Sequence, residues 1–471
     1  MTTTTPTPTA TLSATTDAEL DAVFAAAAAA RGPLAALGID GRRRALDAAA
    51  AALRDAAEAL IPIAREETHL PEGRLRGEIE RTAFQLELYG QAASTAFRVD
   101  HDPADAAADP APRPELYRSH RPIGVVLNFA ASNFPFAFSV AGTDTASALA
   151  AGCPVVVKTH SGHPRLSVAT WQVVAPVLEA HGCPPGTLAL IAGTQAGIRA
   201  LQDPRVGAAA FTGSLKGGRA LFDIACARPT PIPFYGELGS VNPAVVAPHA
   251  AATRGDEIAA GFFASFTLGA GQYCTKPGLL FWPESVPVPD SLLSAVRDAS
   301  LHELLNERIT AGFEDTSTAL ENHPGVSILS RSEAGASRAL LLATDAASVL
   351  ADPASIVECF GPAALVIRYR DGAELVDALG TVEGSLTGTI HADDEDDAIV
   401  RRVLGVMEDR VGRIVWDDWP TGVAVAVGQQ HGGPYPAATS SLHTSVGTHA
   451  IDRFLRPIAY QNVPERFLPV P

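Results

Sequence analysis

Short apolar runs alternate with helical segments between about residues 121 and 240, and this alternation limits the fold more than any other feature of the chain. The apolar runs lie in RPIGVVLNFAASN, CPVVVKTH, LALIAG, VGAAAFTG and PIPFYGEL. Buried strands that alternate with helices of this length form a parallel sheet with crossover helices. The sequence therefore predicts an α/β fold with a doubly wound sheet of the dinucleotide-binding type. It contains no GxGxxG fingerprint, so the alternation alone does not identify the ligand.

The regions on either side have different patterns. Residues 17–100 are rich in Ala and Leu with charges at helical spacing, which predicts helices, and the Pro- and Asp-rich residues 101–115 predict a loop. Residues 241–430 predict a second α/β unit, with strands at LLFWPESV and AALVIRYR and helices near 290–307 and 317–322. The Gly- and Pro-rich residues 431–471 end in an extended stretch that suits an arm pairing with another subunit. Residues 1–16 carry no basic residue, and we expect a flexible tail there rather than a signal peptide.

Charge and cysteine content limit the partners and the compartment. The 471 residues include 35 Lys and Arg against 52 Asp and Glu, a net charge of −17. This charge repels polyanions, so we expect neither a nucleic-acid nor a membrane partner. The five cysteines show no CxxC pair and no zinc-ligand spacing. We therefore expect no structural metal and no disulfide framework, which suits a reducing cytoplasm and leaves one functional thiol open.

Three residues have the chemistry of a nucleophile, a base and an oxyanion donor. Cys274 lies among small residues in TLGAGQYCTKPG, with Lys276 two positions on, and a nearby positive charge lowers the pKa of a thiol. Glu237 ends the apolar strand of FYGELGS, where partial desolvation would raise its pKa toward that of a base. Asn133 follows a strand in AASNFPF and can donate to a developing oxyanion. Taken singly, each residue also suits a plain structural role: a buried apolar side chain, a solvated carboxylate and a turn asparagine.

The order of the motifs along the chain resembles the aldehyde dehydrogenase superfamily. The motifs are SNFP with Asn133, VVVK with Lys158, FTGS, GELG with Glu237, GQYC with Cys274, and ECFGP, and the resemblance covers nearly the whole chain from about residue 17. Within the superfamily, the segments GELGSVNP, GQYCTKPG and GGPYPA are similar to the α-ketoglutaric semialdehyde (2,5-dioxovalerate) dehydrogenase group, which also includes NADP-dependent fatty aldehyde dehydrogenases.

The resemblance implies an aldehyde dehydrogenase-like fold of two doubly wound α/β domains and a small β arm. The implied parts are an NAD(P)-binding domain at 17–104 and 123–240, a catalytic domain at 241–430, and an oligomerisation arm at 105–122 and 431–471. A homodimer or homotetramer would follow from the arm.

The implied reaction is NAD(P)-dependent oxidation of an aldehyde to a carboxylic acid. Cys274 would form a thiohemiacetal, Asn133 would hold the oxyanion, and Glu237 would activate the water that hydrolyses the thioester. The implied cofactor-binding residues are Lys158, Thr159, Ser161, Gly213, Ser214, Gly218, Glu358 and Phe360.

Cofactor preference follows from one position. Relatives that prefer NAD usually place a Glu three residues after the strand-end Lys, where it accepts from the ribose 2′-hydroxyl, and here that position is Ser161. No carboxylate would repel a 2′-phosphate, so we expect NADP to be preferred, with NAD also possible.

The substrate expected from the resemblance is 2,5-dioxovalerate, oxidised to 2-oxoglutarate. Phe134, Phe136 and Phe138 are candidates to line an aldehyde tunnel, with at least one of them expected in the core, and Arg81 is a candidate for the anionic end. The alternatives are a medium- or long-chain aliphatic aldehyde, a CoA-acylating reaction, against which Glu237 argues, and a non-catalytic homologue that acts as a binding or structural protein.

Overall fold

The alternation of strands and helices forms a five-stranded parallel sheet in the computed structural model, which describes residues 12–468. The strand order is β5-β4-β3-β6-β7, with β3 (Val125–Phe129), β4 (Val155–Lys158), β5 (Leu188–Ile191), β6 (Val206–Thr212) and β7 (Phe234–Glu237). The strands are joined through α5 (Thr143–Ala150), α6 (Pro164–Ala180), α7 (Thr194–Gln202) and α8 (Leu215–Cys226). The predicted doubly wound sheet is confirmed. Because β4 and β6 flank β3, the chain order reverses there, and the carboxyl ends of the strands open a crevice.

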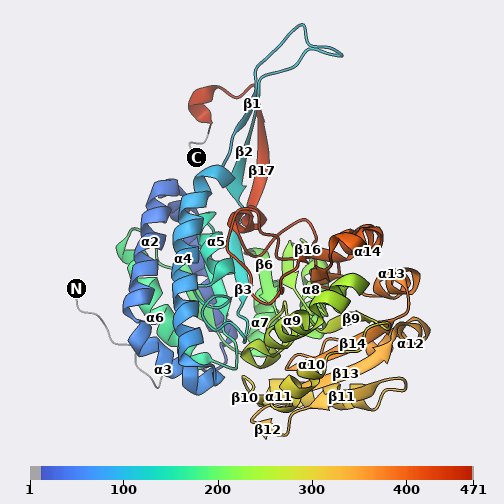
Figure 1. Ribbon diagram of the computed structural model, residues 1–471. Helices are drawn as coiled ribbons and strands as arrows, with labels where there is room; N and C mark the ends of the chain where they lie inside the picture. Colours follow the sequence, from blue (N-terminus) through green and yellow to red (C-terminus); the bar gives the residue numbers. More distant parts are fainter. Residues whose placement is uncertain (1–11, 469–471) are drawn as a thin grey trace.

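The residues before this sheet form four helices, α1 (Asp17–Ala36), α2 (Gly38–Asp55), α3 (Ala57–Thr68) and α4 (Glu72–Ala96). α1 packs directly on β3, β4 and β5, whereas α2, α3 and α4 pack on α5 and α6 (Figure 1). α1 begins with a capping box between Thr16 and Glu19, and the Thr15 N–H donates to the Ala192 carbonyl beyond β5 at 3.0 Å. The predicted flexible tail is therefore wrong for Thr15 and Thr16, and residues 1–11 lie outside the described residues. Between residues 12 and 468 no single helix is long and apolar enough to span a membrane; α1 and α2 pass that test only as a pair bent by 113°.

The second α/β unit contains a seven-stranded sheet in the order β11-β13-β14-β9-β8-β15-β16. Its strands are β8 (Pro243–Val246), β9 (Leu279–Pro283), β11 (Ser327–Arg331), β13 (Leu340–Asp345), β14 (Ala363–Tyr369), β15 (Ser385–His391) and β16 (Val411–Trp416). Its helices are α9 (Pro248–Thr267), α10 (Asp290–Arg297), α11 (Glu307–Glu321), α12 (Ala346–Ala351), α13 (Gly372–Gly380) and α14 (Asp397–Arg410). A two-stranded pair is formed by β10 (Ser300–Leu301) and β12 (Ala334–Gly335), and short 3-10 turns include η1 (Leu268–Gly271) and η4 (Thr448–Phe454).

The helix predicted over 317–322 is longer than expected. The Asn306 side chain accepts a hydrogen bond from the Ile309 N–H, so α11 begins directly after this cap and continues to Glu321. The helix predicted near 290–307 ends ten residues early, at Arg297. The predicted β-strands at LLFWPESV and AALVIRYR are present as β9 and β14, which are neighbours in the sheet.

A three-stranded antiparallel arm projects from the body of the protein (Figure 1). It consists of β1 (Asp100–Asp102), β2 (Leu116–Pro122) and β17 (Leu455–Gln461). Residues 431–454, which were predicted to belong to this arm, instead pass beside β7 and end in η4: the Leu238 N–H donates to the Ala437 carbonyl, and the Thr439 N–H donates to the Gly236 carbonyl. This path requires close backbone approach, since a Cβ at Gly433 would lie 2.4 Å from the Ser385 carbonyl oxygen.

A buried ion pair fixes the end of this segment to the first sheet. Arg453 in η4 lies 2.8 Å from the Asp144 carboxylate in α5, and both side chains are almost fully buried, at 3% and 5% exposure. Burial raises the pKa of Asp144, and the Arg453 guanidinium acts in the opposite direction. Removal of one partner would leave the other as an uncompensated buried charge.

Replacement of Arg453 by Met should lower the free energy of unfolding by about 3–5 kcal/mol, because Asp144 then stays buried without its cation. Urea denaturation measures this loss. The control is Arg401→Met, which removes an ion pair with Asp397 whose side chains are 80% and 71% exposed and should cost less than about 1 kcal/mol. Equal effects of the two substitutions would contradict the interpretation.

Candidate active site

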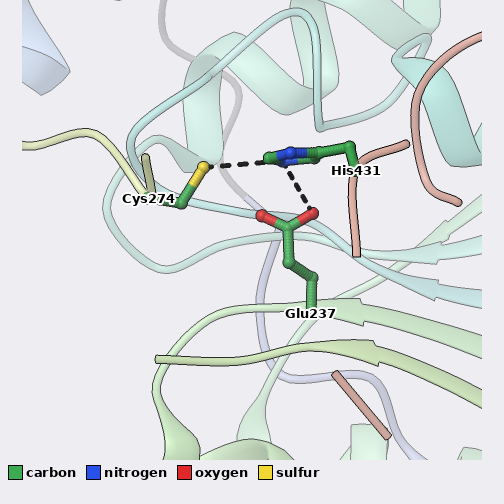
Figure 2. A group of neighbouring side chains, drawn as sticks. All are labelled: Glu237, Cys274 and His431. Carbon is green, nitrogen blue, oxygen red and sulfur yellow. Dashed lines mark hydrogen bonds and ion pairs between the residues drawn. The ribbon is translucent and has the colours of Figure 1, made fainter. Parts of the chain in front are cut away.

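Three side chains from distant parts of the chain meet at the carboxyl end of the first sheet (Figure 2). Glu237 ends β7, Cys274 lies in the turn after η1, and His431 begins the segment beside β7. The Cys274 Sγ lies 3.6 Å from the His431 Nε2, and that nitrogen lies 3.1 Å from the Glu237 Oε2. The Ser445 hydroxyl donates to the same carboxylate oxygen at 2.8 Å.

The structure thus brings together the predicted Cys274 and Glu237, and adds His431, which the sequence analysis missed. The available signal was a histidine directly before the glycine pair of HGGPYPA, the segment already noted for its resemblance. That signal does not place the histidine beside Glu237, because this approach depends on the long-range pairing of residues 437–439 with β7.

The Glu237 carboxylate and the Cys274 thiol have pKa values opposite to those expected. Burial acts to raise the pKa of Glu237, but the neighbouring His431 imidazole and the hydroxyl of Ser445 hold this pKa below its usual value. Burial raises the pKa of Cys274 well above its usual value, and the negative charge of Glu237 raises it further. The resting site therefore holds a carboxylate beside a neutral thiol.

Lys276 does not supply the expected positive charge to the thiol. Its ammonium is buried and donates to the carbonyls of Cys359 and Ala363, at 2.8 and 2.7 Å, so it holds the turn before β14. The nucleophile loop is instead fixed by Asn242, whose side-chain amide donates to the carbonyls of Cys274 and Lys276 at 2.7 and 2.8 Å. Asn242 is thus a positioning residue that the sequence analysis missed.

Asn133 lies against the nucleophile loop. Its side-chain Nδ2 donates to the Gln272 carbonyl at 3.1 Å, which leaves the second amide hydrogen available. Helix α4 holds the backbone of this loop: Arg74 donates to the Asn133 carbonyl, and the Glu78 carboxylate accepts from the Phe136 and Ala137 N–H groups at 2.8 and 3.0 Å. Among the described residues the Cys274 N–H has no hydrogen-bond acceptor, so it is a second donor available for an oxyanion.

Two of the three candidate phenylalanines lie near the triad formed by Cys274, His431 and Glu237. The Phe134 ring contacts Phe138 and Tyr273, each at a centroid distance of 5.4 Å, and the Phe138 ring lies 6.4 Å from that of His431. The prediction for Phe136 is wrong, because its side chain is 1% exposed and packs in the core beneath the N-terminal helices. Arg81, from α4, lies 6.0 Å from the centre of the Phe134 ring.

The predicted cofactor residues surround the crevice at the carboxyl ends of β4 and β6. Lys158 ends β4 and is half-buried, with neither a hydrogen bond nor an ion pair of its ammonium within residues 12–468, and Ser161 is exposed nearby. Thr159 is buried and donates its hydroxyl to the Ile191 carbonyl at 3.2 Å, so its one donor already joins β4 to β5.

Helix α8 begins at the same crevice. Ser214 caps this helix by accepting from the Gly217 N–H at 3.3 Å, and the Gly213 N–H donates to the Glu237 carbonyl at 3.1 Å. A Cβ at Gly218 would lie 2.0 Å from the Leu238 Cδ2, so a larger residue there would require the Leu238 side chain to move. An N-terminus of this kind directs free N–H groups at an anion such as a pyrophosphate.

The Glu358 carboxylate approaches Gly239, just after β7. A Cβ at position 239 would lie only 2.6 Å from the Glu358 Oε2. Burial raises the pKa of Glu358 to about 7, while the Ser240 N–H acts to lower it. Phe360 is half-buried in the turn that leads into β14. An unpaired cation on β4, a capped helix start and a carboxylate together fit a dinucleotide with ribose hydroxyls and phosphates.

Comparisons with known proteins agree with this geometry. Residues 2–311 match the model of the aldehyde dehydrogenase family. The chain is 42% identical over 423 residues to the α-ketoglutaric semialdehyde dehydrogenase 2 of Azospirillum brasilense, covering 88% of this chain and 81% of that protein. It is 39% identical over 439 residues to the α-ketoglutaric semialdehyde dehydrogenase of Acinetobacter baylyi, covering 90% of this chain and 82% of that protein. The chain belongs to the aldehyde dehydrogenase family.

Solved structures show the same fold at low sequence identity. Aldehyde dehydrogenase 21 of Physcomitrella patens is 22% identical with a TM-score of 0.81, covering 96% of this chain and 92% of that one. The proline utilization A protein of Bradyrhizobium japonicum is 21% identical, with a TM-score of 0.81. The match covers 95% of this chain and 45% of the proline utilization A chain. The fold predicted from the motifs is therefore confirmed.

As a member of this family, the protein is an oxidoreductase that uses NAD(P) to oxidise a small-molecule aldehyde to a carboxylic acid. The bound nicotinamide supplies the hydride acceptor. In this aldehyde dehydrogenase the neutral resting thiol beside a carboxylate must lose its proton before it can attack a carbonyl carbon.

The replacement Glu237→Gln should lower the pKa of Cys274, because it removes the negative charge that disfavours the thiolate. In the wild-type enzyme the rate of iodoacetamide alkylation at Cys274 should still be rising at pH 9, and in the variant the midpoint should fall by about 1 pH unit or more. Mass spectrometry of the Cys274 peptide measures the rate. The exposed Cys226 is the internal control and should alkylate equally in both proteins. An unchanged Cys274 profile would show that Glu237 does not set the thiol pKa.

Proposed function

We propose that the protein oxidises 2,5-dioxovalerate to 2-oxoglutarate, with NADP as the preferred cofactor. The observation that carries the substrate assignment is Arg81, a largely buried guanidinium near the nucleophile with no anionic partner in contact among residues 12–468. The two relatives named as α-ketoglutaric semialdehyde dehydrogenases, at 42% and 39% identity, support the same substrate.

Arg81 has the properties of an anion-binding residue. Within the described part of the chain its guanidinium forms neither an ion pair nor a hydrogen bond, and its Nε is fully buried without an acceptor. Burial lowers the pKa of Arg81, while the charges of Glu78 and of the Cys274 thiolate act to raise it. A substrate carboxylate would supply the missing charge-assisted hydrogen bonds.

The proposed acylation step starts with the Cys274 thiol. Its proton passes to the His431 Nε2, which lies 3.6 Å away, and the thiolate sulfur bonds to the aldehyde carbon. The Asn133 amide and the Cys274 N–H stabilise the oxyanion of the resulting thiohemiacetal. Conversion of this thiohemiacetal to a thioester on Cys274 requires loss of a hydride from its carbon, which a nicotinamide bound in the crevice would accept.

The proposed hydrolytic step uses Glu237 as the base. Its carboxylate takes a proton from water, the hydroxide adds to the thioester carbon, and the carbon–sulfur bond breaks to release the acid. The Ser445 hydroxyl and the His431 ring keep Glu237 ionised, so the base is ready when the thioester forms. His431 returns a proton to the departing thiolate.

The preference for NADP is supported by the charges around Ser161. Burial lowers the pKa of Lys158, and the positive charge of the nearby Arg308 lowers it further. Arg308 is exposed and has no ion pair among residues 12–468. Two cations and a hydroxyl suit a 2′-phosphate, which a carboxylate at position 161 would repel.

Replacement of Ser161 by Glu should reverse the cofactor preference. The ratio of kcat/KM for NADP to that for NAD should exceed 1 in the wild-type enzyme and fall by at least about tenfold in the variant, because a carboxylate repels the 2′-phosphate and accepts from a 2′-hydroxyl. Ser94→Glu, on the exposed face of α4, is the control and should leave the ratio unchanged. A wild-type preference for NAD would contradict the proposal.

Replacement of Arg81 by Gln should raise KM for 2,5-dioxovalerate by about 10- to 100-fold, the effect of losing a hydrogen bond to a charged group. The KM for hexanal, which has no carboxylate, should change less than about threefold, and Arg81→Lys should restore part of the loss. Arg76→Gln, an exposed change on the same helix, is the control. Equal losses with both aldehydes would refute the role of Arg81, and wild-type activity with hexanal but not with 2,5-dioxovalerate would refute the substrate.

We also propose a homodimer or homotetramer in the cytoplasm. The edge strand β17 of the arm has no buried residue beyond Leu455 and leaves one side of its backbone without a partner strand among the described residues, as a strand that pairs with another copy would. All five cysteines are free thiols, which suits a reducing compartment.

A further inference from the structure

The Cys274, His431 and Glu237 side chains together have the ligand types of a zinc site. We propose that these three groups bind Zn²⁺ as a reversible inhibitor of the enzyme, with water as the fourth ligand. A thiolate, an imidazole nitrogen and a carboxylate oxygen are the three kinds of protein ligand that Zn²⁺ takes. The metal is not required for the reaction; it occupies the nucleophile and the base at once.

The distances between the ligand atoms fit one tetrahedron. With Zn–S of about 2.3 Å and Zn–N and Zn–O of about 2.0–2.1 Å, tetrahedral ligands are separated by about 3.5 Å for S and N and about 3.3 Å for N and O. The corresponding separations here are 3.6 Å between Sγ and Nε2 and 3.1 Å between Nε2 and Oε2. All three ligand atoms lie within 4.8 Å of one another, so small side-chain rotations complete the set.

The surroundings hold two of the ligands in place and leave the third accessible. The Ser445 hydroxyl donates to the Glu237 Oε2, and the His431 backbone N–H donates to the Thr444 hydroxyl at 2.8 Å. Such outer contacts orient metal ligands. Glu237 and His431 are buried, whereas Cys274 is partly exposed, so the thiol is the ligand that a cation in solution can reach first.

Binding exchanges a proton for the metal. The Cys274 S–H bond breaks, the proton goes to solvent, and the thiolate forms the Zn–S bond, with no change of oxidation state. The sulfur is then unavailable for attack on an aldehyde, and the Glu237 carboxylate is unavailable to take a proton from water. Aldehyde and Zn²⁺ therefore compete for one site, and a chelator restores activity.

Cobalt titration of the chelator-treated full-length enzyme tests the site without using activity. Co²⁺ bound to a thiolate gives a near-ultraviolet charge-transfer absorption, which should saturate at one Co²⁺ per chain and disappear when Zn²⁺ is added. The band should be absent in Cys274→Ser and retained in Cys226→Ser, which removes the exposed cysteine. A band that survives in Cys274→Ser, or no band in the wild-type enzyme, would overturn the proposal.

The contribution of His431 separates a chelate from simple thiol binding. The dissociation constant for Zn²⁺ is measured by competition with a chromogenic chelator, in buffers of fixed free Zn²⁺. It should rise at least about tenfold in His431→Phe. Glu237→Gln is a second variant, which removes the carboxylate charge and should also weaken binding. Folding is checked by circular dichroism, and each variant is compared with its own zinc-free state. Equal Zn²⁺ affinity in the wild-type enzyme and both variants would overturn the three-ligand site. None of these readouts depends on which aldehyde is the substrate.

Discussion

The pairing of residues 437–439 with the end of β7 is the contact on which the active site depends. Backbone hydrogen bonds from Leu238 and Thr439 cross between the two segments and place His431 and Ser445 around the Glu237 carboxylate. The buried pair of Arg453 and Asp144 then anchors the same segment to α5. A part of the chain that lies far from β7 in sequence thereby determines the ionisation of the base at the end of β7.

The charge distribution in the site favours one of the two chemical steps at the expense of the other. A carboxylate that stays ionised is a ready base for hydrolysis, but its charge keeps the neighbouring thiol protonated. A positive charge near the Cys274 sulfur would favour the thiolate despite the charge of Glu237. His431 contacts both groups and is placed to carry the proton between them. Attack by Cys274 thus requires the thiol proton to move to His431, and hydrolysis requires Glu237 to be ionised.

Features encoded locally could be predicted from the sequence, whereas features that depend on tertiary contacts could not. The parallel sheet followed from continuous apolar runs such as VVLNF, which is buried at every position, and Cys274 and Glu237 lie in short motifs whose neighbours are small. The contacts of His431 and Asn242 were not predictable, because each reaches another segment through folding. The same reason explains the reversed pKa of Glu237, since burial and an unseen imidazole act in opposite directions.

The phenylalanines and α11 show how side-chain direction and caps limit such predictions. Phe134, Phe136 and Phe138 are equally apolar in sequence, but the turns between β3 and α5 direct Phe136 into the core and the other two toward the triad. The start of α11 was misplaced because Asn306 caps it with a single side-chain hydrogen bond, which composition does not reveal.

Two side chains of helix α4 connect the N-terminal helices to the loop that carries the oxyanion donor Asn133. Arg74 holds the Asn133 carbonyl, and Glu78 holds the next turn through the Phe136 and Ala137 N–H groups. Any shift of α4 along its axis would therefore be transmitted to the amide that faces the nucleophile. The position of the oxyanion donor therefore depends on how firmly α4 is packed in the N-terminal layer.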